Sequence, residues 1–309
     1  MTKRPHSVEE SARKSISSVL ALGQSKTTLG KLVRRVIKSV GTARSFEQCL
    51  RDFLWWRVAQ GASIDAPVTR AEIEDYLRQE SVRWRQKTVD QHRQALSLVY
   101  SVALTHVEAG IPTIAVGRAY TLDQMERIAC RQASHNALAT RIAFHSGLRA
   151  AEFPELRDAP ELAPEANRPW RNDLFIGMAG GTIYRTVGKG GLARSVLIPH
   201  ELHLQLQSRR LDAPAVVIDR KVRRTAHFCV GGGQAVSESF SSASLRVLDF
   251  SNGFHGLRHA YAQARLETLL SMDLDPLDCL EITSQEMGHL RPDVSLVYTT
   301  RSKPHAAEN

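Results

Sequence analysis

The carboxyl-terminal part of the chain carries a cluster of residue types that could do phosphate chemistry. The run His255-Gly256-Leu257-Arg258-His259 is followed by Gly288-His289, and Tyr298 comes nine positions after that second histidine. An arginine can neutralise a phosphate, a histidine can hold or move a proton, and a tyrosine hydroxyl can attack phosphorus. These are the residue types that phosphodiester transfer through a tyrosine nucleophile needs.

Two segments farther upstream extend this pattern. Residues 146–152 read Ser-Gly-Leu-Arg-Ala-Ala-Glu and supply a second arginine, Arg149, while residues 188–194 place Lys189 in a glycine-rich stretch. Each piece alone has an ordinary interpretation, because a His-x-x-Arg pair often forms a solvated helix face and a Gly-His pair often ends a helix. The order and spacing of all the pieces together favour the chemical interpretation.

In this order, Gly-Leu-Arg-x-x-Glu, a lysine in a glycine-rich hairpin, His-x-Leu-Arg-His, Gly-His and a tyrosine nine residues later resemble the catalytic signature of the tyrosine recombinases, the phage-integrase family. The resemblance spans about residues 121–300. It implies that Glu152 and His259 orient the neighbouring arginine and histidine. The six catalytic positions that it implies are Arg149, Lys189, His255, Arg258, His289 and Tyr298.

The resemblance also implies the roles of these residues. A tyrosine hydroxyl titrates near ~10, so it attacks well only where the charge that develops on the phosphate oxygens is stabilised. Arg149 and Arg258 can each present a planar fork of donors to a phosphate. His255 would accept the tyrosine proton and Lys189 would protonate the departing 5′ oxygen. The product would be a 3′-phosphotyrosyl bond, formed without a metal ion or another cofactor.

The partners implied are double-stranded DNA and three further copies of the chain, as a homo-tetramer on paired DNA sites. Two features depart from the family pattern. The interval from Arg258 to His289 is 31 residues, longer than usual, with Leu270–Pro276 as the extra loop, and only eleven residues follow Tyr298. Two alternatives remain open: strand passage of the type IB topoisomerase kind, and a non-catalytic DNA-binding regulator on the same fold.

The elements that must position these residues suggest a mainly α protein with a small β-sheet or hairpin. We expect a partly disordered tail over residues 1–25, a helical DNA core-binding domain of the SAM-like type over 26–110 and a linker over 111–120, which contains Pro and Gly and has no helical period. A mixed α/β catalytic domain is then expected over residues 121–309.

Capping-box spacings predict where several helices begin. In the first domain they predict helices from Ser45 to Gly61 and from Thr69 onward, and a third helix is expected from Thr88 to near Gly110. In the second domain, Thr121 begins a helix and the next helix ends at Gly147. The other elements expected there are a hairpin of residues 174–187 and 193–198 with Lys189 at its tip, helices over 241–249, 256–270 and 276–287, and a last helix from Pro292 that presents Tyr298.

The charge of the chain indicates a polyanionic partner. The net charge is +9 and the pI is near 9.6. Residues 1–110 hold 18 Lys and Arg against 11 Asp and Glu, a balance of +7, so the excess lies in the amino-terminal part. Within it, Arg83, Arg85 and Lys87 are the predicted contacts to the DNA backbone. The nearby Trp55, Trp56 and Trp84 are expected at the edge of the core.

Several features point away from other classes of protein. No stretch approaches the ~20 apolar residues of a membrane span, and the first residues lack the apolar run of a secretion signal, so a cytoplasmic protein is expected. The four cysteines are scattered without C-x-x-C spacing. They are expected to be reduced and mostly buried, and no metal site or disulfide framework is indicated.

Overall fold

The computed structural model describes residues 7–22, 24, 29–30, 32, 35–112, 117–220 and 222–291, with the backbone alone at Lys189. The chain divides into two compact units, Met1–Ile114 and Ala115–Asn309, each with its own hydrophobic core. The division falls inside the segment 111–120. Helices dominate both units and the sheets are small and antiparallel, which confirms the predicted fold class. In the part of the chain described, no helix is long and apolar enough to cross a membrane.

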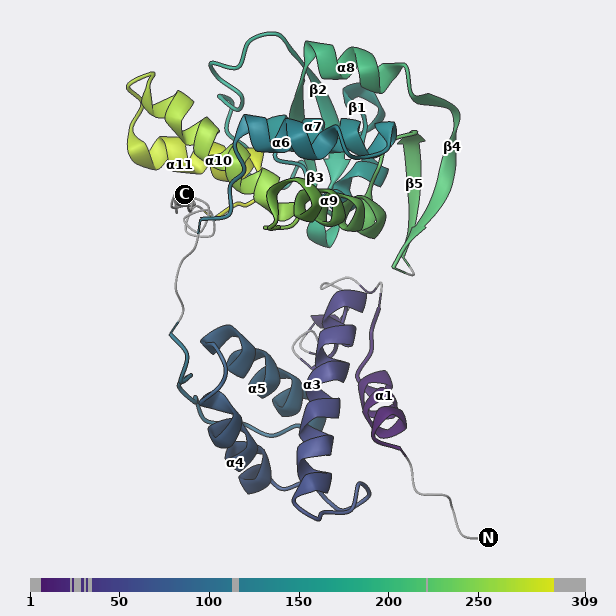
Figure 1. Cartoon of the computed structure of the whole chain (residues 1–309), viewed down its shortest axis with the longest axis vertical. Helices are drawn as coiled ribbons and strands as arrows, with labels where there is room; N and C mark the ends of the chain where they lie inside the picture. Colours follow the sequence, from purple (N-terminus) through teal and green to yellow (C-terminus); the bar gives the residue numbers. More distant parts are fainter. Residues whose placement is uncertain are drawn as a thin grey trace. The chain divides into compact units, whose positions relative to one another are not determined.

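The first unit is built from helices packed around an aromatic centre. Tyr76 is buried there, with ring centroids 5.2 Å from Phe53, 5.4 Å from Trp56 and 5.8 Å from Trp84. Trp56 and Trp84 thus lie at the edge of the core as expected, whereas Trp55 is 53% exposed. The helices are α1 (Val8–Ser18), α3 (Val40–Ala59), α4 (Arg70–Ser81) and α5 (Gln86–Tyr100) (Figure 1).

The expectation of a partly disordered tail is wrong for residues 8–18, which form α1. The Ser7 side chain accepts a hydrogen bond from the backbone N–H of Glu10 and so caps this helix. Val8, Ala12 and Ile16 recur at four-residue spacing and are all buried, which gives the helix one apolar face. The serine-rich composition of this segment therefore does not prevent it from packing.

Two helix boundaries in this unit also differ from the prediction. α3 begins at Val40, because the Ser39 side chain caps the backbone N–H of Thr42 at 3.1 Å. α5 ends at Tyr100, ten residues before Gly110, because Ser101 takes a left-handed conformation with φ of 55°. The apolar residues that follow Ser101 still pack against the core but are not helical. By contrast, the capping box at Thr69 begins α4 as predicted.

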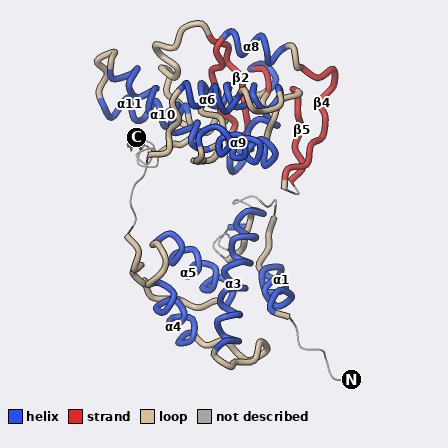
Figure 2. The backbone as a smooth tube through the Cα atoms, viewed as in Figure 1, coloured by secondary structure: helices blue, strands red, loops and turns tan. Residues whose placement is uncertain are grey.

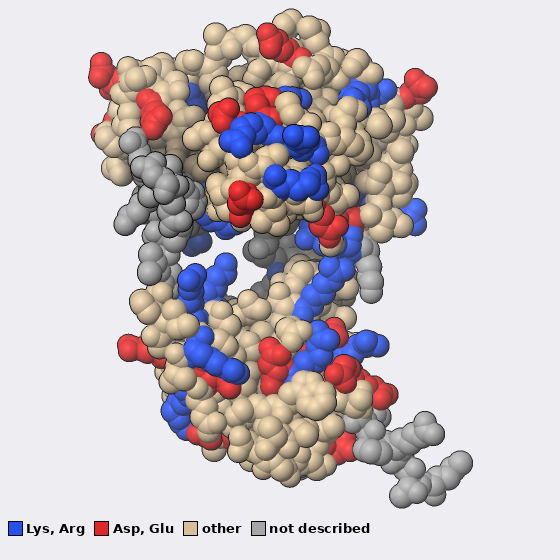
Figure 3. All heavy atoms as spheres, viewed as in Figure 1, with Lys and Arg blue, Asp and Glu red and all other residues tan. Residues whose placement is uncertain are grey.

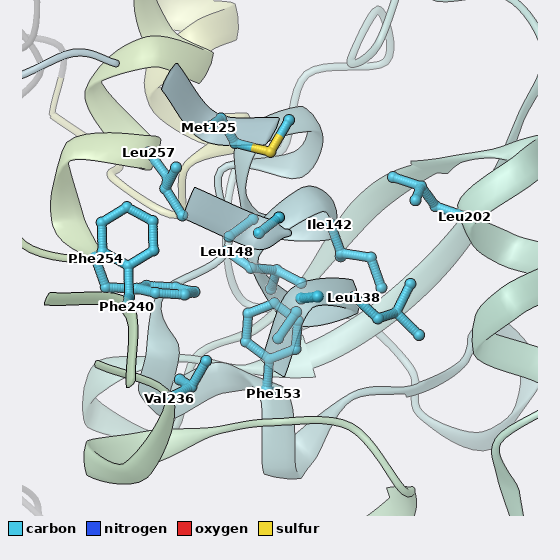
Figure 4. Packing of buried hydrophobic residues seen from close by; sticks show 14 of the residues in the cluster. Met125, Leu138, Ile142, Leu148, Phe153, Leu202, Val236, Phe240, Phe254 and Leu257 are labelled. Carbon is cyan, nitrogen blue, oxygen red and sulfur yellow. The ribbon is translucent and has the colours of Figure 1, made fainter. Parts of the chain in front are cut away.

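The second unit contains a three-stranded antiparallel sheet in the order β1-β2-β3. Figure 2 shows its strand β2 among the helices of this unit. Side chains from α7, α9, α10 and the 3-10 helix η2 meet in one core, where Leu138, Phe153, Phe240 and Leu257 are buried (Figure 4). The elements are α6 (Leu122–Ala129), α7 (Ser134–Ser146), η2 (Ala150–Glu155), β1 (Arg157–Asp158), η3 (Ala159–Glu161), β2 (Gly181–Val187), η4 (Lys189–Gly191), β3 (Ala193–Pro199), α8 (His200–Gln207), β4 (Arg210–Asp219), β5 (Val222–Phe228), α9 (Gly233–Leu248), α10 (His255–Leu270) and α11 (Pro276–Glu286).

Most predicted boundaries in this unit are confirmed. Thr121 and Gln124 form the expected capping box, α7 ends at Gly147 with φ of 63°, and α11 begins at Pro276. The hairpin starts later than expected, at Gly181, because Gly177 and Gly180 have positive φ angles that interrupt an extended backbone. Three further features were not predicted from the sequence: α8, the β4–β5 hairpin and the first two turns of α9. The final helix predicted from Pro292 lies outside the described residues.

Candidate active site

Three segments that lie far apart in the sequence bring Arg149, Arg258 and His289 together. The guanidinium nitrogen Nη2 of Arg149 lies 2.8 Å from Nε2 of His289, and Nη2 of Arg258 lies 3.4 Å from the same atom. A guanidinium can only donate, so Nε2 accepts and the proton of a neutral His289 ring lies on Nδ1. The side chains of two arginines therefore meet at one ring nitrogen of His289.

Arg149 is positioned by the chain reversal at the end of α7. Gly147 adopts φ of +63°, and a Cβ at this position would lie 2.6 Å from Cδ1 of Tyr261. Arg149 is then the N-cap residue of η2, and Glu152 holds it twice. The Glu152 carboxylate accepts from the backbone N–H of Arg149 at 2.8 Å and from its Nη1 at 2.6 Å. The Gly-Leu-Arg-x-x-Glu motif is thus a device that fixes one arginine.

Arg258 is fully buried on the first turns of α10. Its guanidinium donates to the backbone carbonyls of Gly147 and Met287, at the ends of α7 and α11. A guanidinium offers five donors in a fixed fork, so one side chain can join both backbone segments and still approach His289. Arg258 is therefore both a cation at the site and a brace between the segments that carry Arg149 and His289.

His289 is delivered by a tight turn at the end of α11. Its backbone N–H donates to the Ser284 carbonyl at 2.8 Å, and Gly288 takes φ of +73°. A Cβ at Gly288 would lie 2.7 Å from Cδ of Arg194. The glycine of the Gly-His pair is thus required both by the left-handed backbone and by the closeness of a buried side chain.

Arg194, at the start of β3, is a site residue that the sequence analysis missed as a functional position. It is 1% exposed and donates to Oε2 of Glu152 at 2.8 Å and to the Glu286 carbonyl at 2.5 Å. It therefore connects the Lys189 hairpin, the Arg149 turn and the end of α11. A signal was present in the sequence, since an arginine occupies a strand whose neighbours Val196 and Ile198 are apolar.

Electrostatics favour an ionised Glu152. Burial alone would raise the pKa of its carboxyl, but the guanidinium groups of Arg194, Arg149 and Arg258 outweigh burial and lower the pKa to about 2. A second buried pair lies deeper in the unit, where Arg265 and Tyr261 both donate to Glu286 at 2.8 Å. These carboxylates balance the cations that the site requires.

The histidines of the site are neutral near pH 7. Burial and the charges of Arg258 and Arg149 lower the pKa of His289 to about 3. Desolvation by the surrounding protein, with the charge of Arg258, lowers the pKa of His255 to about 4, although His255 still reaches solvent at the start of α10. Burial and the charge of Arg118 lower the pKa of His259 to about 4. The rings of His255 and His259 are 5.6 Å apart, edge to face.

The other predicted residues fall in different places. The backbone of Lys189 lies in η4, the turn between β2 and β3, as predicted, while Tyr298 lies outside the described residues. Arg83, Arg85 and Lys87 are exposed around the start of α5, in the first unit, and Arg83 pairs with Glu80.

The cysteines differ in part from the expectation. Cys49 and Cys279 are buried, but Cys130 and Cys229 are exposed, so "mostly buried" holds for only two of the four. Nδ1 of His227, two positions before Cys229 in the sequence, lies 3.4 Å from a carboxylate oxygen of Glu161. Among the described residues, no group of three or more His, Cys, Asp or Glu side chains could hold a metal ion.

Comparison with known proteins identifies the fold. No protein-family model and no curated protein matches the sequence. The structure is similar to the XerH site-specific recombinase bound to a palindromic difH substrate in a post-cleavage complex, with a TM-score of 0.55 and 13% identity over 96% of this chain and 91% of that chain. The pre-cleavage complex of XerH bound to a difH substrate matches with a TM-score of 0.52 and 14% sequence identity. This match covers 95% of this chain and 92% of that chain. A lambda integrase dimer bound to a COC′ core site matches with a TM-score of 0.49 and 14% sequence identity. This match covers 92% of this chain and 94% of that chain.

The chain therefore has the fold of the tyrosine recombinases, which confirms at the level of fold the resemblance inferred from its motifs. A structural similarity at 13–14% sequence identity establishes the fold alone. The chemistry must be argued from the side chains that the fold brings together.

Proposed function

We propose that this protein is a site-specific DNA recombinase, which cleaves and rejoins double-stranded DNA through a 3′-phosphotyrosyl intermediate. The observation that carries the proposal is the convergence of Arg149 and Arg258 on Nε2 of His289, at 2.8 Å and 3.4 Å. Two guanidinium groups that both donate toward one point form a pair of donors suited to a phosphate oxygen placed there. Such a set would stabilise the charge that develops on the phosphate oxygens during transfer.

The rigidity of this donor set supports the proposal. Glu152 fixes Arg149, and Arg258 is held by the carbonyls of Gly147 and Met287. Donors that are already oriented need little rearrangement when charge develops, which is the source of most electrostatic catalysis. A solvated pair of surface arginines would lack this property.

The remaining steps are assigned to His255, Lys189 and Tyr298. The Tyr298 hydroxyl forms the new bond to phosphorus and passes its proton to His255, which is neutral near pH 7. The bond from phosphorus to the 5′ oxygen breaks, and Lys189 protonates that oxygen. Attack by the 5′ hydroxyl of another strand reverses both steps. His259, 5.6 Å from the His255 ring, would orient it.

The proposal extends to the way DNA is held. The helical first unit would act as the core-binding domain, with Arg83, Arg85 and Lys87 on phosphates of the backbone, and the active assembly would be a homo-tetramer on paired sites in the cytoplasm. Basic side chains lie over α3 and α5 in the view of Figure 3. The helical unit carries most of the excess positive charge of the sequence, which supports this assignment.

The test is a nicked duplex incubated with the full-length protein. We expect a covalent adduct that resists denaturation and survives excess EDTA, because two arginines already supply the charge. Tyr298→Phe should abolish the adduct, and Arg149→Ala or Arg258→Ala should slow its formation. Arg131→Ala is the matched control, because Arg131 is an exposed arginine of the same unit.

The outcomes separate the open alternatives. Adduct formation followed by joining of strands from two duplexes supports a recombinase, whereas relaxation of a supercoiled plasmid without exchange of partners indicates a topoisomerase. Binding of DNA without any adduct would contradict the proposal and support a regulator. Loss of cleavage on chelation, restored by Mg²⁺, would indicate metal-dependent chemistry instead.

A further inference from the structure

A second hairpin, β4–β5, lies on the flank of the second unit opposite α10 and α11 (Figure 1). It is a two-stranded antiparallel sheet, with Ile218 paired to Arg223 and Val216 paired to Thr225. On β5, Ala226 and Phe228 are buried, so alternate residues of this strand face the unit. Because paired residues share a face, the outer face of the hairpin carries Val216, Ile218, Arg223 and Thr225.

The hairpin is fastened to the unit at its tip and along its inner face. Near the tip, the Asp219 carboxylate accepts from the backbone N–H of Gln234 at 2.9 Å and so satisfies a donor at the start of α9. On the inner face, Arg224 lies 3.8 Å from Glu155. At the base, Arg210 pairs with Asp158 and Glu161, and its guanidinium lies 5.5 Å from the Phe228 ring. The outer face is therefore presented on a fixed support.

That outer face is unusual for a solvent-facing surface. Ile218 is 73% exposed and Val216 is 59% exposed, and the exposed Arg223 lies beside them. In the part of the chain that the structure describes, the outer-face pairs Val216 with Thr225 and Ile218 with Arg223 contain no acidic side chain, and Arg223 has no ion pair. The exposed Asp212 lies farther along β4, outside these pairs. The tip adds the exposed Arg220, which lies 3.4 Å from the Asp219 carboxylate, within the run Arg-Lys-Val-Arg-Arg at residues 220–224. Two large β-branched side chains without cover, flanked by arginines, indicate a partner.

We propose that the β4–β5 hairpin enters the major groove of duplex DNA and contributes to recognition of the target sequence. This inference rests on the proposed function. The major groove, ~12 Å wide, admits a two-stranded β-ribbon. Arginine binds O6 and N7 of guanine, and apolar side chains contact the thymine methyl group, so the residue types on the outer face are those that read base edges. Arg220 would contact a phosphate beside the groove.

The test selects preferred sites from a library of random duplexes with the full-length protein. We expect the wild-type protein to select a motif. Arg223→Ala should relax the preference at one guanine position by about ten-fold or more, the scale of one bidentate base contact. Ile218→Ser should relax a thymine position. Arg131→Ala, which changes the same charge elsewhere on the unit, should leave the motif unchanged.

A second measurement protects the test from failures of folding. Arg223 and Ile218 are both exposed. Arg223→Ala and Ile218→Ser should therefore keep the wild-type circular dichroism spectrum and should form the covalent adduct on a nicked duplex at saturating protein. Arg220→Ala should lower affinity for all sequences alike and reduce the salt dependence of binding, since a phosphate contact carries no sequence information.

The outcomes distinguish this inference from the proposed function. A motif that is unchanged in Arg223→Ala and Ile218→Ser overturns the groove assignment while the adduct still supports a recombinase. An unchanged motif together with altered sedimentation would make the hairpin a contact between protein copies, which also overturns it. A wild-type protein that forms no adduct refutes the proposed function. If that protein still selects a motif that the ribbon variants relax, the groove assignment stands by itself.

Discussion

Glu152 is the position where a single atom change should have the largest effect. Its carboxylate is 1% exposed and accepts from the Arg149 backbone, the Arg149 side chain and the Arg194 side chain, at 2.6 to 2.8 Å. Glu152→Gln keeps the size of the side chain and one acceptor oxygen. The substitution removes the negative charge and turns an amide N–H₂ group toward the guanidinium of Arg194, which is itself 1% exposed.

Two considerations that rest on the same buried ion pairs give the magnitude. Removal of one partner of a buried ion pair costs about 3–5 kcal/mol, because the other charge stays buried without compensation. The carboxyl pKa of Glu152 falls from 4.5 to about 2 in the folded protein, a difference that corresponds to about 3 kcal/mol in favour of the ionised form. We therefore expect Glu152→Gln to reduce the free energy of unfolding of the second unit by about 3 kcal/mol or more.

The control is Glu126→Gln. Glu126 makes a bidentate pair with Arg141, at 2.7 Å for the closest atoms, but its side chain is 42% exposed. An exposed pair contributes about 0–1 kcal/mol, so the control should lose no more than that. Addition of Arg194→Met to Glu152→Gln should recover part of the loss, because the uncompensated cation is then removed.

The assay is urea unfolding with pulsed hydrogen exchange and mass spectrometry. Peptides from α7 and α10 report on the second unit, and peptides from α3 report on the first unit, where the substitution should have no effect. Equal losses for Glu152→Gln and Glu126→Gln would refute the reasoning. A double variant whose loss equals the sum of the two single losses would show that the two charges are not coupled.

Three further predictions follow from the geometry, the histidine pKa values and the proposed chemistry. Gly147→Ala should destabilise the second unit more than Gly180→Ala in urea unfolding, because both have positive φ but only the first would meet a side chain, at 2.6 Å; equal losses would contradict the predicted clash. The three site histidines have folded pKa values of about 3 to 4, below the ordinary 6.5, so they are neutral in the native state and take up protons on unfolding. Their stabilising contribution is complete above pH 6.5 and is lost as the pH falls toward 4, and a free energy of unfolding that stays flat over this range would refute the assignment. Lys189→Ala should slow cleavage by ~10²–10⁴-fold, and a substrate with sulfur at the bridging 5′ position should recover most of that rate, but little of the rate lost in Arg149→Ala; equal defects on both substrates would mean that Lys189 only holds DNA.

The parts of the fold that the sequence predicts well are those with a local physical signal. Thr121 and Thr69 begin helices because their side chains and the residues three positions later satisfy free backbone N–H groups at the helix start. Gly147 and Pro276 end and begin helices through their own backbone preferences. In each case the cause lies within four residues of the boundary.

The parts that the sequence does not predict depend on distant contacts. α1 is stable because its apolar face packs against α3, which a serine-rich segment does not reveal. The β4–β5 hairpin has an outer face with Ile218 and Val216 uncovered, so it lacks the polar alternation expected of a half-exposed strand. α9 has no side-chain cap of its own, because Asp219 from the neighbouring hairpin provides the acceptor.

The residues of the candidate site also fall into two groups, those with a local sequence signal and those whose role depends on distant contacts. Arg149, Arg258 and His289 could be chosen from their motifs, and the structure brings all three together. The sequence marks Arg194 only as a charged residue in a strand with apolar neighbours. Its role could not be predicted, because that role depends on Glu152 and on the carbonyl of Glu286, 42 and 92 positions away. Local sequence therefore identifies the groups that would contact a phosphate, whereas the groups that hold them in place become visible only in the folded chain.

The most direct test of the central claim is to identify the residue and the strand end joined in the covalent adduct. The adduct trapped on a nicked duplex would be digested with protease and nuclease, and the peptide that carries a nucleotide would be sequenced by mass spectrometry. The account predicts one modified peptide, with a 3′-phosphate ester on the oxygen of Tyr298. A nucleotide on another residue, or a bond to a 5′-phosphate, would contradict it.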